Sequence, residues 1–193
     1  MTNTLTLGQA RDAYLQRYGF STAAYEERWA AIKLGPIKFW IPSTRTRREA
    51  IRFHDLHHTL TGYPAIPSGE AEIGAWEVAT GCGRFRAAWV LNLFAMGMGL
   101  LIAPGKTFRA WVRGRKTKSN FYHLTYDEAL LHRSADEMRR EIGLPEAPPA
   151  ATVADKASFV LWAGVALLQY ALAAAILLAP VAALVYWLAW VRQ

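Results

Sequence analysis

The C-terminal end of the chain limits the possible folds more than any other stretch. From residue 157 to residue 190 it reads ASFVLWAGVALLQYALAAAILLAPVAALVYWLAW, 34 residues without a charged side chain. A single helix of that length would extend about 51 Å, well beyond the roughly 30 Å of a bilayer core. Pro180 marks the expected bend, because proline disrupts a helix. We predict a membrane anchor over 157–193, either one span with an interfacial piece or two short helices.

The remainder of the chain has the charge of an ordinary globular domain. Residues 1–156 hold 21 basic and 15 acidic side chains, a net charge of +6. Cys82 is the single cysteine, which excludes an intrachain disulfide. The opening MTNTLTLGQARD lacks the basic and apolar regions of a signal peptide. We predict an all-α, single helical domain over 1–145 and a Pro/Ala-rich linker over 146–156, with the domain on the cytoplasmic face of a membrane.

A basic run, 105-GKTFRAWVRGRKTK-118, contains six Lys or Arg and no acidic residue. Phe108 and Trp111 lie within it, a pattern that suits anionic lipid headgroups as well as a phosphate backbone. No helix-turn-helix, zinc-finger or RNA-binding pattern accompanies the run, which disfavours nucleic acid as a partner. A solvated loop is the alternative interpretation. By the positive-inside tendency the run belongs on the cytoplasmic side.

Capping signals predict where the helices of the first half begin and end. Thr6 can cap a helix over 7–18, and Ser21 or Thr22 can cap one over 23–34, followed by an extended IKFWIP segment. Thr46 and Glu49 form a T-x-x-E capping box for the next helix, and Gly62 suits its left-handed end. After a proline-bearing loop, Ser68 can cap a further helix over 69–81.

The segment 54-HDLHHTLTGYPAIPSGE-70 holds three of the five histidines. On a helix His54 and His58 lie one turn apart, about 40° around the axis, and Asp55 falls about 60° beyond His58. A helix–loop–helix hairpin would return Glu70 to the same place. These four residues predict a site with two nitrogen and two carboxylate ligands, which suits a divalent metal, with zinc favoured. His57 is interpreted either as a neighbour that supports the ligands or as a solvent-facing residue.

The same histidines can be compared with surfaces that hold no metal and with three known metal-binding patterns. A histidine pair at i and i+4 is also common on exposed helices without any metal. The zincin pattern H-E-x-x-H is not met, because Asp55 stands where the glutamate is required. His54, His57 and His58 spell one HxxHH box of the membrane desaturases, but those enzymes need several boxes and about eight histidines. The HD phosphohydrolases need an additional histidine upstream, and residues 1–53 contain none.

The pattern HDxxH, followed by eleven residues and a Glu, resembles the signature of the coenzyme Q (ubiquinone) biosynthesis family that acts on C1 of the polyprenylated ring. FHDLHHTLTGY, GEAEIGAWEVATG and HRSADEMRREIGLP extend the resemblance over roughly residues 6–145. It implies a mostly helical, membrane-associated protein with a hydrophobic channel for an isoprenoid tail and a metal at its mouth. By this resemblance His54, Asp55, His58 and Glu70 are the metal ligands. The long apolar tail departs from the family, whose usual members bind membranes peripherally.

The apolar stretch 85-FRAAWVLNLFAMGMGLLIAP-104 fits the expected lipid pocket. We interpret it as a buried or membrane-embedded helix, with an ordinary core helix as the alternative. The residues expected to contact the lipid tail are Leu93, Phe94, Met96 and Leu100. The expected partners are a polyprenylated quinone precursor or another isoprenoid lipid, the membrane, other enzymes of quinone biosynthesis and a second copy of the chain.

Two functions of different classes follow from these features. The first is a metal-dependent decarboxylase (a lyase) that removes the C1 carboxylate of a polyprenylated benzoquinone precursor oxidatively, although nothing in the sequence supplies the oxidant. The second is a non-catalytic, membrane-anchored scaffold or prenyl-lipid-binding protein of a quinone or isoprenoid pathway, in which a metal only holds two helices together. An open coordination position would distinguish a catalytic site from a structural one.

Overall fold

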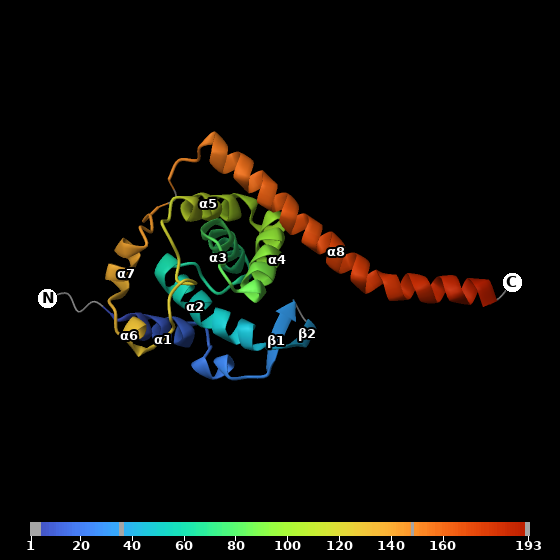
Figure 1. Ribbon diagram of the computed structural model, residues 1–193, viewed down its shortest axis with the longest axis horizontal. Helices are drawn as coiled ribbons and strands as arrows, with labels where there is room; N and C mark the ends of the chain where they lie inside the picture. Colours follow the sequence, from blue (N-terminus) through green and yellow to red (C-terminus); the bar gives the residue numbers. More distant parts are fainter. Residues whose placement is uncertain (1–4, 35–36, 148, 192–193) are drawn as a thin grey trace.

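The computed structural model describes residues 5–34, 37–147 and 149–191 (Figure 1). Most of these residues are helical, which confirms the all-α prediction. The helices are α1 (Leu7–Arg17), α2 (Arg45–Thr61), α3 (Pro67–Thr80), α4 (Arg86–Ile102), α5 (Pro104–Arg115), α6 (Glu128–Leu131), α7 (Ala135–Glu141) and α8 (Val153–Val191). A short 3-10 helix, η1 (Thr22–Tyr25), and two strands complete the described elements.

The capping residues explain where the first helices begin and end. Thr6 caps α1 in a reciprocal capping box with Gln9, as predicted. Helix α2 begins two residues earlier than predicted, because Thr44 rather than Thr46 accepts the hydrogen bond of a first-turn amide. It ends as predicted at Gly62, whose φ of 77° is left-handed. In α3 the first helical residue is Pro67, so Ser68 lies inside the helix and is not its cap.

A further sequence prediction in this half, the type of the second element, was wrong. The expected helix over 23–34 is instead η1 followed by strand β1 (Trp29–Leu34), which pairs antiparallel with β2 (Ile37–Pro42) in a hairpin. The extended conformation expected for IKFWIP gives β1 a partner for its backbone hydrogen bonds. Aromatic and β-branched residues in both segments favour strands, so pairing outweighed the local helix propensity of the first segment.

Helix α3 lies at the centre of the helical body, between α2, α4 and α5 (Figure 1). Small residues allow the close packing. A Cβ atom on Gly74 would meet α4 at Ala95 and at the Asn92 carbonyl, and one on Gly114 of α5 would meet the Trp76 backbone of α3. Trp76 is fully buried in the resulting core. The close approach of these helices fixes the position of every side chain that α3 carries.

Helix α8 has two different halves. Its first half packs on α4 and α5, with Trp162 stacked on Trp89 at a centroid distance of 5.4 Å and the Tyr170 hydroxyl donating to the Phe94 carbonyl at 2.7 Å. Its second half projects away from the body (Figure 1). The helix continues through Pro180 as one element and bends in this half. Whether this segment meets a membrane as one span or as two short pieces stays a prediction. By length and composition α8 could cross a membrane.

Candidate metal site

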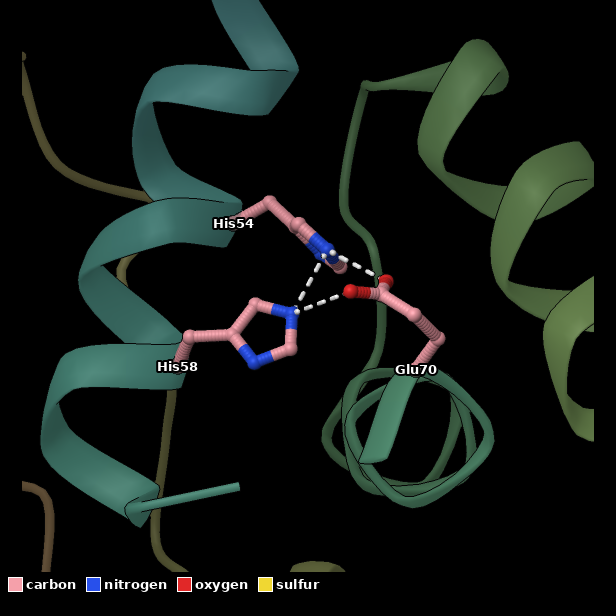
Figure 2. Close-up of side chains that lie close together, drawn as sticks. All are labelled: His54, His58 and Glu70. Atoms are coloured by element: carbon pink, nitrogen blue, oxygen red, sulfur yellow. Dashed lines mark hydrogen bonds and ion pairs between the residues drawn. The ribbon is translucent and has the colours of Figure 1, made fainter. Parts of the chain in front are cut away.

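Two histidines and one glutamate converge between α2 and α3 (Figure 2). His54 and His58 lie one turn apart on α2, and their Nε2 atoms are 3.1 Å from each other. The Glu70 carboxylate faces both rings, with one oxygen 3.5 Å from the His54 Nε2 and the other 3.4 Å from the His58 Nε2. The ligand atoms of the three residues lie within 4.8 Å of one another. This spacing allows one small cation to be bound by all three.

Glu70 reaches the histidines because the loop between α2 and α3 folds tightly. It stands in the first turn of α3, as predicted. The preceding residue, Gly69, is buried, and a Cβ atom there would overlap the carbonyl oxygen of Pro64. Only glycine permits that approach of the loop to the helix. Because the glycine of the sequence PSGE has no side chain, the loop can approach α3 closely enough to place the Glu70 carboxylate beside the histidines.

The outward nitrogens of both imidazoles have acceptors. The His58 Nδ1 lies 2.9 Å from the Tyr63 carbonyl oxygen, and the His54 Nδ1 lies 3.0 Å from a Glu77 oxygen. A carbonyl or carboxylate oxygen can only accept, so each Nδ1 carries the hydrogen. In the neutral rings both Nε2 lone pairs then face each other at 3.1 Å. That arrangement is unfavourable unless a proton or a metal ion lies between them, and this donor set also fits a divalent metal of the zinc type.

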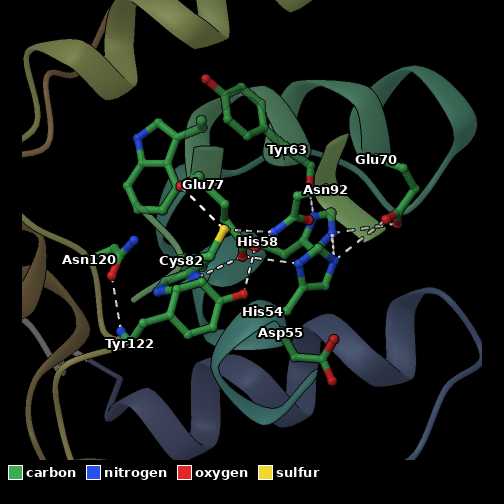
Figure 3. A network of polar contacts seen from close by, with 12 residues as sticks. His54, Asp55, His58, Tyr63, Glu70, Glu77, Cys82, Asn92, Asn120 and Tyr122 are labelled. Carbon is green, nitrogen blue, oxygen red and sulfur yellow. Dashed lines mark hydrogen bonds and ion pairs between the residues drawn. The ribbon is translucent and has the colours of Figure 1, made fainter. Parts of the chain in front are cut away.

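Glu77 is the centre of the polar network behind the site (Figure 3). Its Oε1 atom contacts His54 and also the His57 Nδ1 at 2.7 Å. Its Oε2 atom accepts from the Tyr122 hydroxyl at 2.6 Å and from the Asn92 amide. Burial raises the pKa of this carboxyl, but the two imidazoles outweigh burial and hold its pKa well below the ordinary value. A fully buried glutamate is thus kept charged by four donors.

The sequence motifs do not include Glu77, which is completely buried in the structure. It stands two turns after Glu70, and a seven-residue separation returns a helix to nearly the same face. That spacing was the available signal, but an acidic residue is rarely fully buried unless it is paired. Its partners come from α2, α4 and the segment after α5, and no local pattern connects them.

His57 supports Glu77 rather than joining the three converging residues. Its Nε2 accepts the backbone N–H of Phe121 at 2.9 Å, which leaves Nδ1 as the donor to Glu77. Burial lowers the pKa of His57, so the ring is neutral. The structure therefore favours the first of the two interpretations of His57, a neighbour that supports the ligands.

The structure does not bring Asp55 into the group of three. Its Oδ2 atom accepts from the Tyr25 hydroxyl at 2.6 Å, and Figure 3 shows the carboxylate directed away from the two imidazoles. Burial raises the pKa of Asp55, and the nearby His54 and the Tyr25 hydrogen bond only partly offset this. Residue i+1 on a helix is rotated by about 100°, and here that rotation aims the side chain at η1. The predicted four-ligand set thus becomes three converging residues with Asp55 at their side.

His54 and Glu70 of the converging group have pKa values shifted in opposite directions. Burial lowers the pKa of His54, but the carboxylates of Glu77 and Glu70 raise it well above 6.5. Burial raises the pKa of Glu70, but its hydrogen bonds to His54 and His58 lower it strongly overall. Each group therefore favours a charge opposite to that of its neighbour. A metal cation would replace the proton that His54 otherwise holds.

The predicted lipid-contacting residues lie on α4. Met96 is fully buried and Leu93 nearly so, both in the hydrophobic core of the described residues. Phe94 packs edge-on against Tyr170 of α8 at 4.9 Å, and Leu100 is half-buried. Two surface pockets of the described residues are lined by other residues. The assignment of these four residues to a lipid tail stays a prediction.

The basic run is partly engaged within the fold. It forms most of α5, where Arg113 is buried and donates to the carbonyls of Thr61 and Pro145. Lys116 pairs with Asp155, near the start of α8, at 2.9 Å. Lys106 and Arg109 are exposed. The run is therefore helical rather than a solvated loop, and part of its charge holds α8 in place.

Comparison with known proteins supports a relation to ubiquinone biosynthesis. The chain is 27% identical over 106 residues to the "Ubiquinone biosynthesis protein COQ4, mitochondrial" of Yarrowia lipolytica. The matched part covers 49% of this chain and 37% of that protein's length. No family model matches the chain. No solved structure matches it either.

Proposed function

We propose that this protein is a metal-dependent, membrane-bound enzyme of ubiquinone biosynthesis that acts on C1 of a polyprenylated benzoquinone precursor. The reaction is oxidative decarboxylation, in which the bond from C1 to the carboxylate breaks, carbon dioxide leaves, C1 takes a hydroxyl group from water with release of a proton, and an external oxidant accepts the two electrons. The convergence of His54, His58 and Glu70 on one point is the observation that carries the proposal. The similarity to the Yarrowia protein supplies the pathway.

His54, His58 and Glu70 would hold the metal, with Asp55 beside them as a second carboxylate. A bound dication supplies Lewis acidity, which stabilises negative charge on a ring oxygen or carboxylate. Glu77 and the Tyr63 carbonyl fix the orientation of the two imidazoles through their Nδ1 hydrogens. Such supporting contacts raise the basicity of metal-binding histidines.

Solvent reaches the site from the side of Glu70. The Glu70 side chain is 39% exposed, whereas that of His58 is 2% exposed. The ring of Tyr14 stacks on His58 at a centroid distance of 5.4 Å, and its hydroxyl donates to the Tyr63 carbonyl at 3.2 Å. An aromatic ring therefore already covers one face of the site. A substrate ring would enter beside Glu70, opposite the packed core.

Helix α8 fits a substrate with a polyprenyl tail, because such a tail resides in the bilayer. The helix is long and apolar enough to cross a membrane. Its first half holds the body close to the point where the second half projects. We propose that α8 anchors the body at the membrane surface, with the basic α5 on the cytoplasmic side.

A metal that only joins α2 to α3 is the competing hypothesis, and it would make the protein a scaffold or lipid carrier. Structural metal sites are closed by four protein ligands, whereas catalytic sites keep a position open. Three converging residues with a partly exposed carboxylate fit the second description better. Loss of the metal should therefore abolish turnover while the helical body stays folded.

Metal analysis of the full-length protein in detergent tests the proposal. We expect near-stoichiometric metal in the wild type and its loss in His58→Ala and in Glu70→Ala, with unchanged helicity by circular dichroism. His132→Ala and Glu128→Ala are matched controls, because both side chains are largely exposed and both residues are distant in sequence from the site. A folded wild type that binds neither zinc, manganese nor iron after reconstitution would contradict the metal site.

The reaction requires its own assay. Carbon dioxide release from a polyprenylated ring carboxylate, in membranes with an oxidant present, should depend on His58 and on Glu70. Persistent binding of polyprenyl compounds without turnover in the metal-loaded wild type would favour the scaffold.

A further inference from the structure

The segment 28–48 has a composition unlike that of its surroundings. It contains six basic residues and no acidic one across 21 positions, and it includes two tryptophans and one phenylalanine. It comprises β1, β2 and the first turn of α2. The basic residues are Arg28, Lys33, Lys38, Arg45, Arg47 and Arg48. Basic and aromatic side chains together are typical of protein surfaces that contact anionic lipid headgroups.

The hairpin formed by β1 and β2 exposes its tryptophans. The exposed fraction is 58% for Trp29 and 57% for Trp40. The Lys38 Nζ atom lies 5.2 Å from the centre of the Trp40 ring. Neither strand packs extensively against another described element, and an isolated two-stranded hairpin is at best marginally stable in water. Contact with the surface of another molecule would therefore stabilise this hairpin.

Despite its exposure, the hairpin is held firmly at its base. Ser43 is buried, and its amide donates to the Arg28 carbonyl at 2.8 Å. The Arg47 guanidinium donates to the Ser43 hydroxyl at 3.1 Å, and Arg48 donates to the Ser43 carbonyl. These bonds join the hairpin to the start of α2, the helix that carries both histidines. A surface that binds the hairpin therefore also sets the orientation of α2, and of its two histidines, relative to that surface.

The positive charges at the start of α2 favour binding of an anionic partner. Its first turn contains no acidic residue, while Arg45, Arg47 and Arg48 stand in or next to it. Positive charge at a helix N-terminus opposes the helix dipole and is unfavourable in the isolated protein. Of these three, only Arg45 forms an ion pair within the described residues, with Glu49 at 2.8 Å. Phosphate groups of a lipid surface would remove this repulsion.

We propose that the described residues of segment 28–48 (28–34 and 37–48) dock on the surface of an anionic phospholipid bilayer, as a second membrane contact beside α8. Figure 1 shows the hairpin on the side of the body from which the second half of α8 projects. A bilayer crossed by that half would then be close to the hairpin. The inference rests on the proposed membrane attachment and adds the orientation of the body, because two contacts prevent rotation about α8.

Site-specific fluorescence in proteoliposomes tests the docking with the full chain. Ala31 is exposed and pairs with Trp40 in the hairpin register, so Ala31→Cys introduces a label without removing a tryptophan or a charge. Ala129→Cys on α6 is the matched control, because Ala129 is also exposed and α6 lies on the opposite side of the body (Figure 1). Cys82 is fully buried and should not react with the NBD label.

In phosphatidylserine-containing vesicles we expect a blue shift of the NBD emission at position 31 and its quenching by doxyl-labelled lipids, and neither effect at position 129. Both effects at position 31 should weaken in pure phosphatidylcholine vesicles. They should also weaken in the Lys38→Gln/Trp40→Ser double variant, whose two changed side chains are exposed.

Equal responses at positions 31 and 129 would overturn the docking, and an unchanged response at position 31 in neutral vesicles would overturn the role assigned to the charges. Vesicle flotation of the same samples reports on α8 independently. Protein that floats without quenching at position 31 contradicts only the hairpin contact, whereas protein that does not float contradicts the membrane attachment as well. A blue shift at position 31 that appears without vesicles, on adding nucleic acid or on dimer formation, together with no quenching by doxyl-labelled lipids, would assign the surface to that partner instead.

Discussion

Helices α2 and α3 bury charged and polar side chains, whereas the second half of α8 exposes apolar ones. Around Glu77, four donors from three parts of the chain meet one carboxylate that solvent does not reach. Along α8, residues 174–184 and 186–191 are all exposed, and most of them are apolar. The two regions depart in opposite directions from the usual distribution, in which charges face water and apolar groups face the core.

Each departure indicates a different environment. Burying a carboxylate is costly unless donors compensate it, and the network around Glu77 uses four donors to hold two imidazoles in one orientation. Large exposed apolar surfaces mark contact with a protein or a membrane. We therefore expect the first region to bind a cation and the second to contact lipid. Changes to the two regions can therefore be compared by how much each alters the free energy of unfolding of the helical body.

The largest effect is expected from Glu77→Ala. It leaves buried donors on His57, Tyr122 and Asn92 without an acceptor, and breaking a buried charged pair costs about 3–5 kcal/mol. Urea unfolding of the variant, with Glu128→Ala as the control, measures this loss. Glu77→Gln keeps the size and one acceptor, so it should remain folded while its metal affinity falls about 10- to 100-fold. Wild-type affinity in Glu77→Gln would contradict the supporting role of Glu77.

Metal binding should stabilise the body by about 2.7 kcal/mol when the free metal is a hundredfold above the dissociation constant. The raised pKa of His54 sets the pH dependence. In the metal-free protein, the protonated ring stabilises the fold below pH 6.5, and this contribution is lost as the pH rises through the folded-state pKa. Metal requires the neutral ring, so the stabilisation by metal should increase over the same range.

Thermal unfolding with zinc and with a chelator, measured on both sides of pH 6.5, gives this difference directly. His54→Gln should flatten the pH dependence of the chelated protein. A zinc effect that is independent of pH would argue against His54 as a ligand.

Gly69→Ala should cost about 1–3 kcal/mol, the usual penalty of forcing additional atoms into packed structure. The new methyl group would overlap the Pro64 carbonyl, so the loop must move and carry Glu70 away from the histidines. Metal content and thermal stability should fall together. Gly164→Ala in α8 is the matched control, because no atom lies within 4 Å of the added carbon, and it should leave both quantities unchanged.

The smallest effect on the body is expected from removal of residues 171–193. The described side chains of that half are largely exposed, so the free energy of unfolding should change by less than about 0.5 kcal/mol. Vesicle flotation, in contrast, should be lost. A truncated protein that unfolds would show that the two regions are not independent.

Local patterns predicted several elements because their causes are local. The Thr6 cap, the glycine end of α2 and the position of Glu70 in the first turn of α3 depend on residues within one or two turns. The hairpin was missed because the strand over 29–34 exists only through pairing with 37–42. The site shows the same division. The i, i+4 spacing put His54 and His58 together, but the direction of Asp55 depended on Tyr25, thirty residues earlier.

The sequence by itself determined that the chain is helical, that two histidines share one face of a helix, and that its last helix is apolar along nearly its whole length. Helical periodicity and apolar composition are properties of residues close together in the sequence, so they can be recognised without knowing the tertiary structure. The tertiary structure alone decided that Glu77 is buried behind the histidines and that α8 is docked for only half of its length. Both outcomes depend on which surfaces meet, because burial and the supply of hydrogen-bond donors come from residues distant in sequence.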